Sequence, residues 1–544
     1  MIGASFVGKG SLLTVRDDSG RLIRHTTMRF AFFHPVALSR LGLLGCLISS
    51  ATLRADVRLP SLFSDHMVLQ RGKPIPVWGW ADNGEEVTVE FLGKKTKTVA
   101  KDGKWLVRLP SQKAGGPFEL RIQGKNKLTL ADVLVGEVWV CSGQSNMEWS
   151  MTRSENPGPD IAASANANLR LFTVPKLKAT EPVGDVKSSW KTSSPESTAG
   201  FSAVAYYFGR DLQKSLGVPV GLIHTSWGGS PAEVWMSQEV LESNPTYKRD
   251  ILDQFEKALN NYQTALAKHE KELETAKKEN RKPVGNRPNL GWRPSELYNG
   301  MIHPLLPFAI QGAIWYQGES NAGRAHQYRS LFADMIKNWR SKWGQGDFAF
   351  LEVQLAPWDK NKKRSLTEIV ASPTDSDWAE LREAQWMATR TLPNVGMVVI
   401  TDVGDKDDIH PAKKAPVGAR LALAARKIAY REKLVHSGPL YKSHKIDGSE
   451  IKLRFDHVGS GLEARGGALS GFSIAGPDEK FYWAEARIEV NQIVVSSPKV
   501  PKPVAVRFGW ADYPVVNLFN REGLPASPFR TDNFRMVTEP KGSR

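Results

Sequence analysis

Cysteine is nearly absent from this chain, which has only Cys46 and Cys141 among its 544 residues. Two cysteines exclude a disulfide framework, so the protein must be stabilised by large hydrophobic cores. The sequence also lacks an apolar run long enough to span a bilayer, and we expect no membrane span. No stretch rich in Lys and Arg is interleaved with aromatic residues, so nothing predicts a nucleic-acid interface.

The first 55 residues resemble an export signal preceded by extra sequence. Met28 and Arg29 begin a basic segment, and residues 41–49 form an apolar core too short to cross a bilayer. We expect residues 1–27 to be an over-called translation start and residues 28–55 a signal peptide. The mature protein is then secreted or periplasmic, and the lack of disulfides favours bacterial export.

The overall composition is that of a soluble globular protein with excess positive charge. Hydrophobic residues make up 41% of the chain and charged residues 24%. The formal net charge is +16, to which the first 55 residues contribute +5. A basic balance is compatible with acidic substrates such as sialic acid or uronic acid polymers. The length predicts two to four domains.

The pattern of apolar residues divides the mature chain into three parts. Residues 56–131 alternate apolar and polar between frequent turns, which predicts an N-terminal β-domain. Residues 132–431 combine fully apolar runs with amphipathic helical patterns, as in a parallel sheet covered on both faces. Residues 432–544 return to β-patterned segments and predict a C-terminal β-domain. The fold class is therefore α/β with flanking β-domains. The apolar runs lie at 138–141, 220–224, 309–316, 348–354 and 396–401, and the helical patterns at 204–216, 328–339, 377–391 and near 414–430.

A helical insertion at about 241–290 interrupts the central part. Its apolar positions between Leu252 and Ala276 are spaced alternately three and four residues apart, a heptad pattern on a helix rich in Lys and Glu. The simplest interpretation is a solvated arm packed along one stripe. The alternatives are an oligomerisation helix and a helix that gates the substrate. The sequence does not predict the oligomeric state.

The strongest chemical signal is an apolar strand followed at once by Gly143, Gln144 and Ser145. Ligands of an open parallel sheet bind beyond the carboxyl ends of its strands, so Ser145 is expected in the site. The adjacent glycine allows the tight backbone that exposes a nucleophilic hydroxyl. An isolated Gly-x-Ser is more often an ordinary polar turn. Cys141 has the parity of the buried run, and we expect it in the core rather than as a nucleophile.

A serine nucleophile requires a base, and His410 is the best placed of the 11 histidines. It lies between an apolar strand and a helix, and therefore at the same edge of the sheet. Asp407 and Asp408 precede it by three and two residues, and either could orient the imidazolium. The acidic run before His410 could instead form a cation-binding loop.

Two further polar loops follow apolar strands at this edge. Gly228 or Gly229 could offer a backbone N–H to a tetrahedral oxyanion, and Gln317 or Asn321 a side-chain amide. Either loop alone would be an ordinary turn. The four loops together favour one shared site.

These blocks together resemble the SGNH (GDSL-like) hydrolases, and specifically the sialate O-acetylesterase-like carbohydrate acetylesterases. The resemblance includes residues 62–71, residues 297–304 and the segment from Asp408 to Lys413, and it covers nearly the whole mature chain. It implies a flavodoxin-like sheet in an SGNH hydrolase domain with flanking β-domains. It also implies deacetylation without a metal or cofactor, through an acyl-enzyme on Ser145.

The resemblance leaves the acid of the triad open. The superfamily's Asp-x-x-His pattern places this acid on Asp407, and the sialate-type pattern favours Asp408. Some related acetylesterases use the glutamate of a Gln-Gly-Glu block, which is Glu319 here. We rank the candidates in this order. The superfamily's third-block asparagine corresponds to Gln317, with Asn321 as the alternative.

The expected function is therefore a secreted carbohydrate O-acetylesterase that uses Ser145 and His410 on an acetylated carbohydrate substrate. One alternative is an esterase of acetylated xylan or pectin. Another is a carbohydrate-binding protein that has lost catalysis, because 17 Trp and 11 Tyr would suit stacking on sugars. Binding alone does not require the Ser145 and His410 pair, which favours an enzyme.

Overall fold

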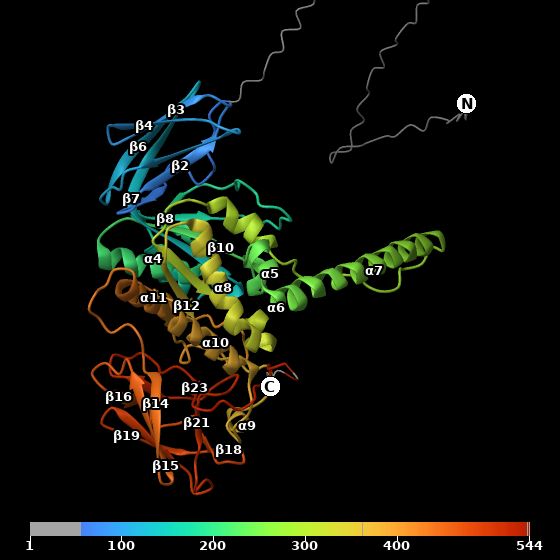
Figure 1. The fold of residues 1–544 in the computed structure, drawn as a ribbon, viewed down its shortest axis with the longest axis vertical. Coiled ribbons are helices and arrows are strands. Elements are labelled where there is room, and N and C mark those ends of the chain that lie inside the picture. Colours follow the sequence, from blue (N-terminus) through green and yellow to red (C-terminus); the bar gives the residue numbers. More distant parts are fainter. Residues whose placement is uncertain (1–55, 362, 541, 543–544) are drawn as a thin grey trace, which may run out of the picture. The chain divides into compact units, whose positions relative to one another are not determined.

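The computed structural model describes residues 56–361, 363–540 and 542 (Figure 1). The expected over-called start and signal peptide at 1–55 lie outside these residues. Within the described part of the chain, no helix is both long enough and apolar enough to cross a membrane.

The N-terminal part is built from strands, and its last strand continues into the central sheet. Strand β7 is 17 residues long, and its exposed first half pairs antiparallel with β6. Its second half is fully buried and pairs in parallel with β10 and β11. The expected boundary between residues 131 and 132 therefore falls inside a strand that both parts share. The strands are β1 (Val68–Gln70), β2 (Ile75–Trp80), β3 (Glu86–Phe91), β4 (Lys94–Val99), β5 (Lys104–Leu109), β6 (Gly115–Gln123) and β7 (Lys127–Gly143).

The central sheet has the strand order β13-β12-β11-β7-β10-β8-β9. Neighbouring strands from β13 to β8 are parallel, and β9 is antiparallel to β8, so the sheet is mixed. Five of these strands correspond to the five apolar runs of the sequence, whereas β8 and β9 do not. The remaining strands of this sheet are β8 (Asn166–Thr173), β9 (Lys191–Ser193), β10 (Val220–Ser226), β11 (Gly312–Tyr316), β12 (Ala349–Val353) and β13 (Val395–Val398).

Helices cover both faces of the central sheet. Successive side chains of β7 point to opposite faces, and each face has its own core. Val138 and Val140 are buried in one core with residues of α8 and α10. Trp139 and Cys141 are buried in the opposite core with residues of α4 and α11. Cys141 is fully buried, as expected from its parity. The covering helices are α4 (Ala203–Leu216), α8 (Ala325–Trp343), α10 (Asp377–Thr391) and α11 (Ala415–Ile428).

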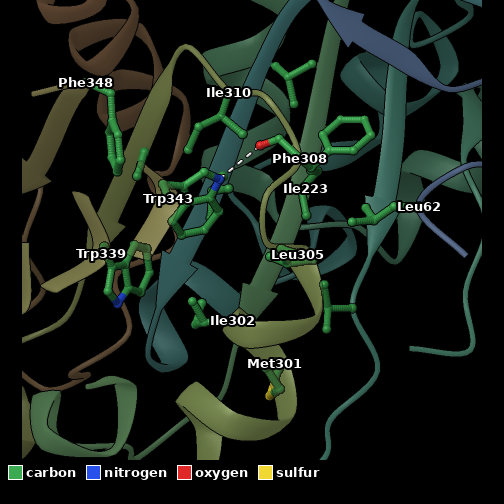
Figure 2. Packing of buried hydrophobic residues seen from close by; sticks show 14 of the residues in the cluster. Leu62, Ile223, Met301, Ile302, Leu305, Phe308, Ile310, Trp339, Trp343 and Phe348 are labelled. Carbon is green, nitrogen blue, oxygen red and sulfur yellow. Dashed lines mark hydrogen bonds between the residues drawn. The ribbon is translucent and has the colours of Figure 1, made fainter. Parts of the chain in front are cut away.

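One of these cores also includes residues of the N-terminal part. Figure 2 shows Leu62 packed in the same cluster as Ile223 of β10 and Phe308. The indole N–H of Trp343 donates a hydrogen bond of 2.9 Å to the carbonyl of Phe308, so its polar atom is satisfied inside the cluster. The N-terminal strands and the helices of the central part are therefore stabilised by one continuous core.

The insertion forms a long helix, α7 (Asp253–Lys278), that extends away from the sheet (Figure 1). Ala276 is the one residue of α7 that is fully buried, which agrees with a largely solvated arm. The other helices are α1 (Ser145–Glu148), α2 (Pro157–Ala162), α3 (Pro195–Ala199), α5 (Gln238–Ser243), α6 (Pro245–Tyr247) and α9 (Leu366–Ile369).

The C-terminal part is made of short antiparallel sheets around a separate core. It contacts the central part through polar groups: Gln354 donates to the Ser527 hydroxyl, and Arg382 donates to the carbonyls of Ala511 and Asp512. Its strands are β14 (Leu440–Asp447), β15 (Glu450–Asp456), β16 (Leu462–Ala464), β17 (Phe472–Ala475), β18 (Phe481–Trp483), β19 (Glu485–Glu489), β20 (Gln492–Ser496), β21 (Ala505–Phe508), β22 (Leu518–Asn520) and β23 (Phe529–Arg530).

Candidate active site

The carboxyl end of β7 places Ser145 at the first residue of α1. Gly143, the last residue of β7, has a φ of +141°, and a Cβ there would lie 2.2 Å from the carbonyl oxygen of Tyr316. Only glycine therefore allows β7 to end so close to β11. The N–H of Gln144 then donates to the same carbonyl at 3.0 Å, which fixes the turn before the serine.

Ser145 and His410 lie in direct contact, although 265 residues separate them. The distance between Ser145 Oγ and His410 Nε2 is 2.8 Å. The Trp149 ring stacks on the His410 imidazole, with ring centroids 5.1 Å apart and an interplanar angle of 17°. The imidazole is thus held in the orientation that a base for the serine hydroxyl requires.

The electrostatic surroundings of His410 lower its pKa and so favour its neutral form. Its pKa is lowered from 6.5 mainly by burial, and the positive charges of Lys414 and Arg153 lower it further, whereas Asp408 opposes them. A neutral imidazole is the form that can accept a proton at neutral pH. The site is therefore electrostatically suited to a histidine base.

Asp408 is the candidate acid that the structure brings to His410. The Asp405 carboxylate accepts the N–H groups of Asp407 and Asp408, and Asp408 Oδ1 accepts the N–H of His410 at 2.8 Å. These turns place Asp408 Oδ1 3.5 Å from His410 Nδ1. The contact is on the ring nitrogen opposite the one that faces Ser145.

The other two candidate acids are held elsewhere. Asp407, the first in the expected order, has an exposed carboxylate paired with Lys406. Glu319 accepts a hydrogen bond of 2.6 Å from Asn146 Nδ2, and burial raises the pKa of its carboxyl. Across the described residues, neither carboxylate forms a hydrogen bond or ion pair with His410. The turns at Asp405 direct Asp408, and not Asp407, toward the imidazole, so the geometry favours Asp408 over the candidate that was ranked first.

Asn146 connects the serine loop to the histidine loop, a role that the sequence analysis missed. Its Nδ2 also donates to the carbonyl of Ile409, at 3.0 Å, and its Oδ1 accepts from Lys414 Nζ at 2.5 Å. Burial lowers the pKa of Lys414 to about 7, while the Glu319 carboxyl opposes that shift. The only sequence feature that could have indicated this contact is position, because Asn146 directly follows Ser145 and Ile409 directly precedes His410.

We expect Asn146→Ala to lower both activity and stability. The loss of three buried hydrogen bonds should reduce the free energy of unfolding by about 1–3 kcal/mol. Misplacement of the two loops should reduce kcat roughly 10- to 100-fold with little change in KM. Denaturant unfolding and steady-state kinetics measure the two effects. Asn321→Ala, which removes another buried amide, is the control and should destabilise the protein without a comparable loss of kcat.

Of the two glycines expected to bind an oxyanion, Gly228 lies beside Ser145, but its N–H group is occupied. A Cβ on Gly228 would be 3.2 Å from the Cβ of Ser145, so the two loops touch. The Gly228 N–H donates to Glu148 Oε2 at 2.7 Å. In the part of the chain that the structure describes, the N–H groups of Ser145 and Gly229 have no hydrogen-bond partner. These two remain the available backbone donors.

The structure does not present Gln317 or Asn321 to the nucleophile. Both side chains are fully buried, and Gln317 Nε2 donates to Asn321 Oδ1 at 2.7 Å and to the Ser230 carbonyl at 3.2 Å. Asn321 Nδ2 donates to Glu233 at 3.0 Å. Their amide hydrogens therefore hold neighbouring loops together. These contacts favour backbone N–H groups, rather than either amide, as donors to an oxyanion.

A cavity of about 590 Å³ opens over Ser145 and His410, a volume suited to a small ligand. A larger cavity of about 1130 Å³ lies beside the start of α7 and contains neither residue. The smaller cavity is the candidate site because it contains the reactive pair. Its other side chains include Glu148, Trp149, Arg153, Lys176, His224 and Trp227, none of which the sequence analysis had identified.

The acidic residues before His410 do not converge on a common point where a cation could bind. Asp402 pairs with Arg420 at 2.6 Å, and Asp405 accepts backbone N–H groups. Among residues 56–361, 363–540 and 542, no group of three or more His, Cys, Asp or Glu side chains could hold a metal ion. The alternative of a cation-binding loop at these positions has no support in the contacts.

Comparisons with known proteins show which family the chain resembles. The family model described as carbohydrate esterase, sialic acid-specific acetylesterase, matches residues 135–283 and 284–427. The chain is 31% identical over 535 residues to a sialate O-acetylesterase of Mus musculus, covering 87% of this chain and 94% of the relative. It is 32% identical over 437 residues to the Homo sapiens sialate O-acetylesterase, covering 74% and 77%.

A solved structure is also similar. A carbohydrate acetylesterase from Xanthomonas citri shares 40% sequence identity with this chain, with a TM-score of 0.75. The match covers 88% of this chain and all of the other. The resemblance therefore extends over the three parts of the fold and is not confined to the motif loops.

Proposed function

The chain belongs to the carbohydrate esterase family described as sialic acid-specific acetylesterase, and from this premise we propose that it removes O-acetyl groups from sialic acids with Ser145 as nucleophile. It is a carboxylic ester hydrolase, a sialate O-acetylesterase-like carbohydrate acetylesterase. The observation that carries the mechanism is the 2.8 Å contact between Ser145 Oγ and the neutral His410 imidazole inside the cavity. Ester hydrolysis needs this pairing of an alcohol with a base.

In the first half of the proposed reaction, His410 Nε2 takes the proton of Ser145 as Oγ attacks the acetyl carbonyl carbon. The N–H groups of Ser145 and Gly229 are the proposed donors to the oxyanion. The bond between the carbonyl carbon and the sugar oxygen then breaks, and His410 returns the proton to that oxygen. Asp408 stabilises the imidazolium that exists between the two proton transfers.

In the second half, water replaces the sugar. His410 takes a proton from the water as its oxygen attacks the acetyl carbon of the acyl-enzyme. The bond to Ser145 Oγ breaks, Oγ regains its proton from His410, and acetate leaves. Every proton transfer uses the one imidazole, which explains why it must be neutral at the start of each half.

The proposal includes export of the mature protein. It is supported by the basic start and short apolar core within residues 28–55, which match an export signal. Exported proteins often rely on disulfides for stability. The hydrophobic cores of this chain are extensive enough that the lack of disulfides is compatible with export.

Acetate release from four substrates tests the substrate assignment. O-acetylated sialic acid should be cleaved with a kcat/KM at least about tenfold above that of acetylated xylan, because acetylated xylose units are neutral and one favourable contact to the sialate carboxylate contributes about this much. Acetylated pectin also carries carboxylates, so its cleavage shows whether another acidic sugar is accepted. An aryl acetate reports the hydrolase independently of the sugar. A preference for xylan or pectin would assign a polysaccharide esterase. Binding of sugars without release of acetate from any ester would instead favour the carbohydrate-binding alternative.

A further inference from the structure

We propose that Arg153 anchors the carboxylate of an acidic sugar in the active-site cavity. Arg153 ends a 3₁₀ turn, Met151–Arg153, that follows α1, and it lines the cavity over Ser145 and His410. The inference rests on the proposed function and deepens it, since it names the group that distinguishes an acidic sugar from a neutral one at this site.

The Arg153 guanidinium is held in place by an aromatic ring. Its central carbon lies 3.5 Å from the centroid of the Trp149 ring, and the Trp149 indole N–H donates to the Arg153 carbonyl at 2.6 Å. Stacking on an indole reduces the freedom of a side chain that would otherwise move in solvent. Because Trp149 also stacks on His410, one ring fixes the position of the cation relative to the base.

Arg153 is the unpaired cation of the cavity. Lys176, the other cation in the lining, is 2.6 Å from the Glu148 carboxylate. Burial lowers the pKa of His224 to about 4, so this second histidine of the cavity is neutral. Arg153 has no carboxylate within 4.0 Å in the described ranges of the chain. The cavity thus has one positive charge that the protein itself does not balance.

A sugar carboxylate matches that charge in both sign and shape. The planar guanidinium presents paired N–H donors that fit the two oxygens of a carboxylate, and such charge-assisted pairs are stronger than neutral hydrogen bonds. A neutral acetylated sugar offers this charge only hydroxyl and carbonyl oxygens, which are weaker acceptors than a carboxylate. A carboxylate held over Trp149 would also set the distance from the acid group of the sugar to Ser145, so the anchor favours one range of acetyl positions.

The test compares two esters that differ only in the anionic group. These are O-acetylated N-acetylneuraminic acid and its C1 methyl ester, with the acetyl group at the same position. For the wild-type protein we expect kcat/KM to be about 10- to 100-fold higher for the free acid, mostly through KM. Arg153→Met should reduce this ratio to about one, and Arg153→Lys should retain part of it. Because a ratio is measured, changes in the chemistry that affect both esters cancel.

Lys178→Met is the matched control. Lys178 lies outside the cavity lining and pairs with Glu296 at 3.1 Å, so loss of its charge should leave the ratio unchanged. A ratio that persists in Arg153→Met, or a wild-type protein that treats both esters alike, would overturn the anchor. Competitive inhibition of the wild-type protein by free sialic acid, compared with its methyl ester, gives an answer even if Arg153→Met does not fold.

The proposed function can fail separately from the anchor. If the wild-type protein cleaves aryl acetate but no sialate ester, the sialate assignment is wrong. The same comparison is then made with O-acetylated galacturonic acid oligomers and their methyl esters. A preference for the acidic oligomers that disappears in Arg153→Met supports the anchor, and equal cleavage of both forms rejects it.

Discussion

Replacement of Ser145 by alanine is expected to lower kcat for acetate release by about 10⁴-fold or more. The variant keeps the backbone donors at Ser145 and Gly229 but loses the atom that forms the acyl-enzyme. His410 would then have only a water molecule to activate. Direct attack by water loses the advantage of a nucleophile fixed 2.8 Å from its base. Steady-state acetate release, and the absence of a pre-steady-state burst of the leaving alcohol when an aryl acetate is in excess over the enzyme, measure the effect.

Ser142→Ala is the matched control for this variant. Ser142 lies three residues earlier, in β7, and its hydroxyl is fully buried with no hydrogen-bond partner in the described part of the chain. Removal of an unsatisfied buried hydroxyl should be neutral or stabilising. We expect Ser142→Ala to keep activity within a few-fold and Ser145→Ala to unfold at the wild-type temperature. Substantial ester cleavage by a folded Ser145→Ala protein would mean that another group is the nucleophile.

The central fold could be predicted because its buried strands leave a clear signal. Five mostly apolar runs became β7, β10, β11, β12 and β13, and amphipathic patterns became the helices on the two faces. Strand β8 escaped notice because Asn166, Asn168 and Arg170 interrupt its apolar residues. Arg170 is nevertheless buried, and its side chain is neutralised by Asp132 at 2.6 Å. Such a strand is stabilised by a long-range ion pair that no local pattern reveals.

The proximity of Ser145 and His410 could be predicted for a topological reason. Ser145 and His410 each follow an apolar strand of one parallel sheet, so both had to lie at its carboxyl edge. The direction in which a side chain points could not be predicted in this way, as Gln317 and Asn321 show. Both follow β11 at the same edge, yet their amides are directed into a buried network with Ser230 and Glu233. Sequence position identifies the loop, whereas packing decides which way each side chain points.

The sequence did not predict which residues shape the cavity, although several of them lie in the motif loops. Trp149 and Arg153 belong to a helical turn and a 3₁₀ turn after the nucleophile, where their spacing is unremarkable in the sequence. Their significance comes from contacts that the fold creates: the Trp149 ring stacks on His410, and the Arg153 guanidinium lies over the Trp149 ring. Lys414 was missed for the same reason, since its contact with Asn146 spans 268 residues.

The choice between Asp408 and Asp407 is decided by paired substitutions. We expect Asp408→Asn to lower kcat about 10²- to 10⁴-fold, because the imidazolium loses the carboxylate 3.5 Å from Nδ1. Asparagine retains the oxygen that accepts the His410 N–H, so the turn itself should persist. Asp407→Asn should change kcat less than about twofold, since it removes an exposed carboxylate paired with Lys406.

The pH profile separates loss of the acid from a general disturbance of the loop. His410 works as a base when neutral, so kcat/KM should fall as the pH drops below the lowered pKa of this imidazole. The negative charge of Asp408 raises that pKa, so Asp408→Asn should move the acid limb to still lower pH, while Asp407→Asn should leave it in place. Glu319→Gln completes the set. If Glu319→Gln alone abolished turnover, or if Asp407→Asn matched Asp408→Asn, the acid of the triad would have to be reassigned.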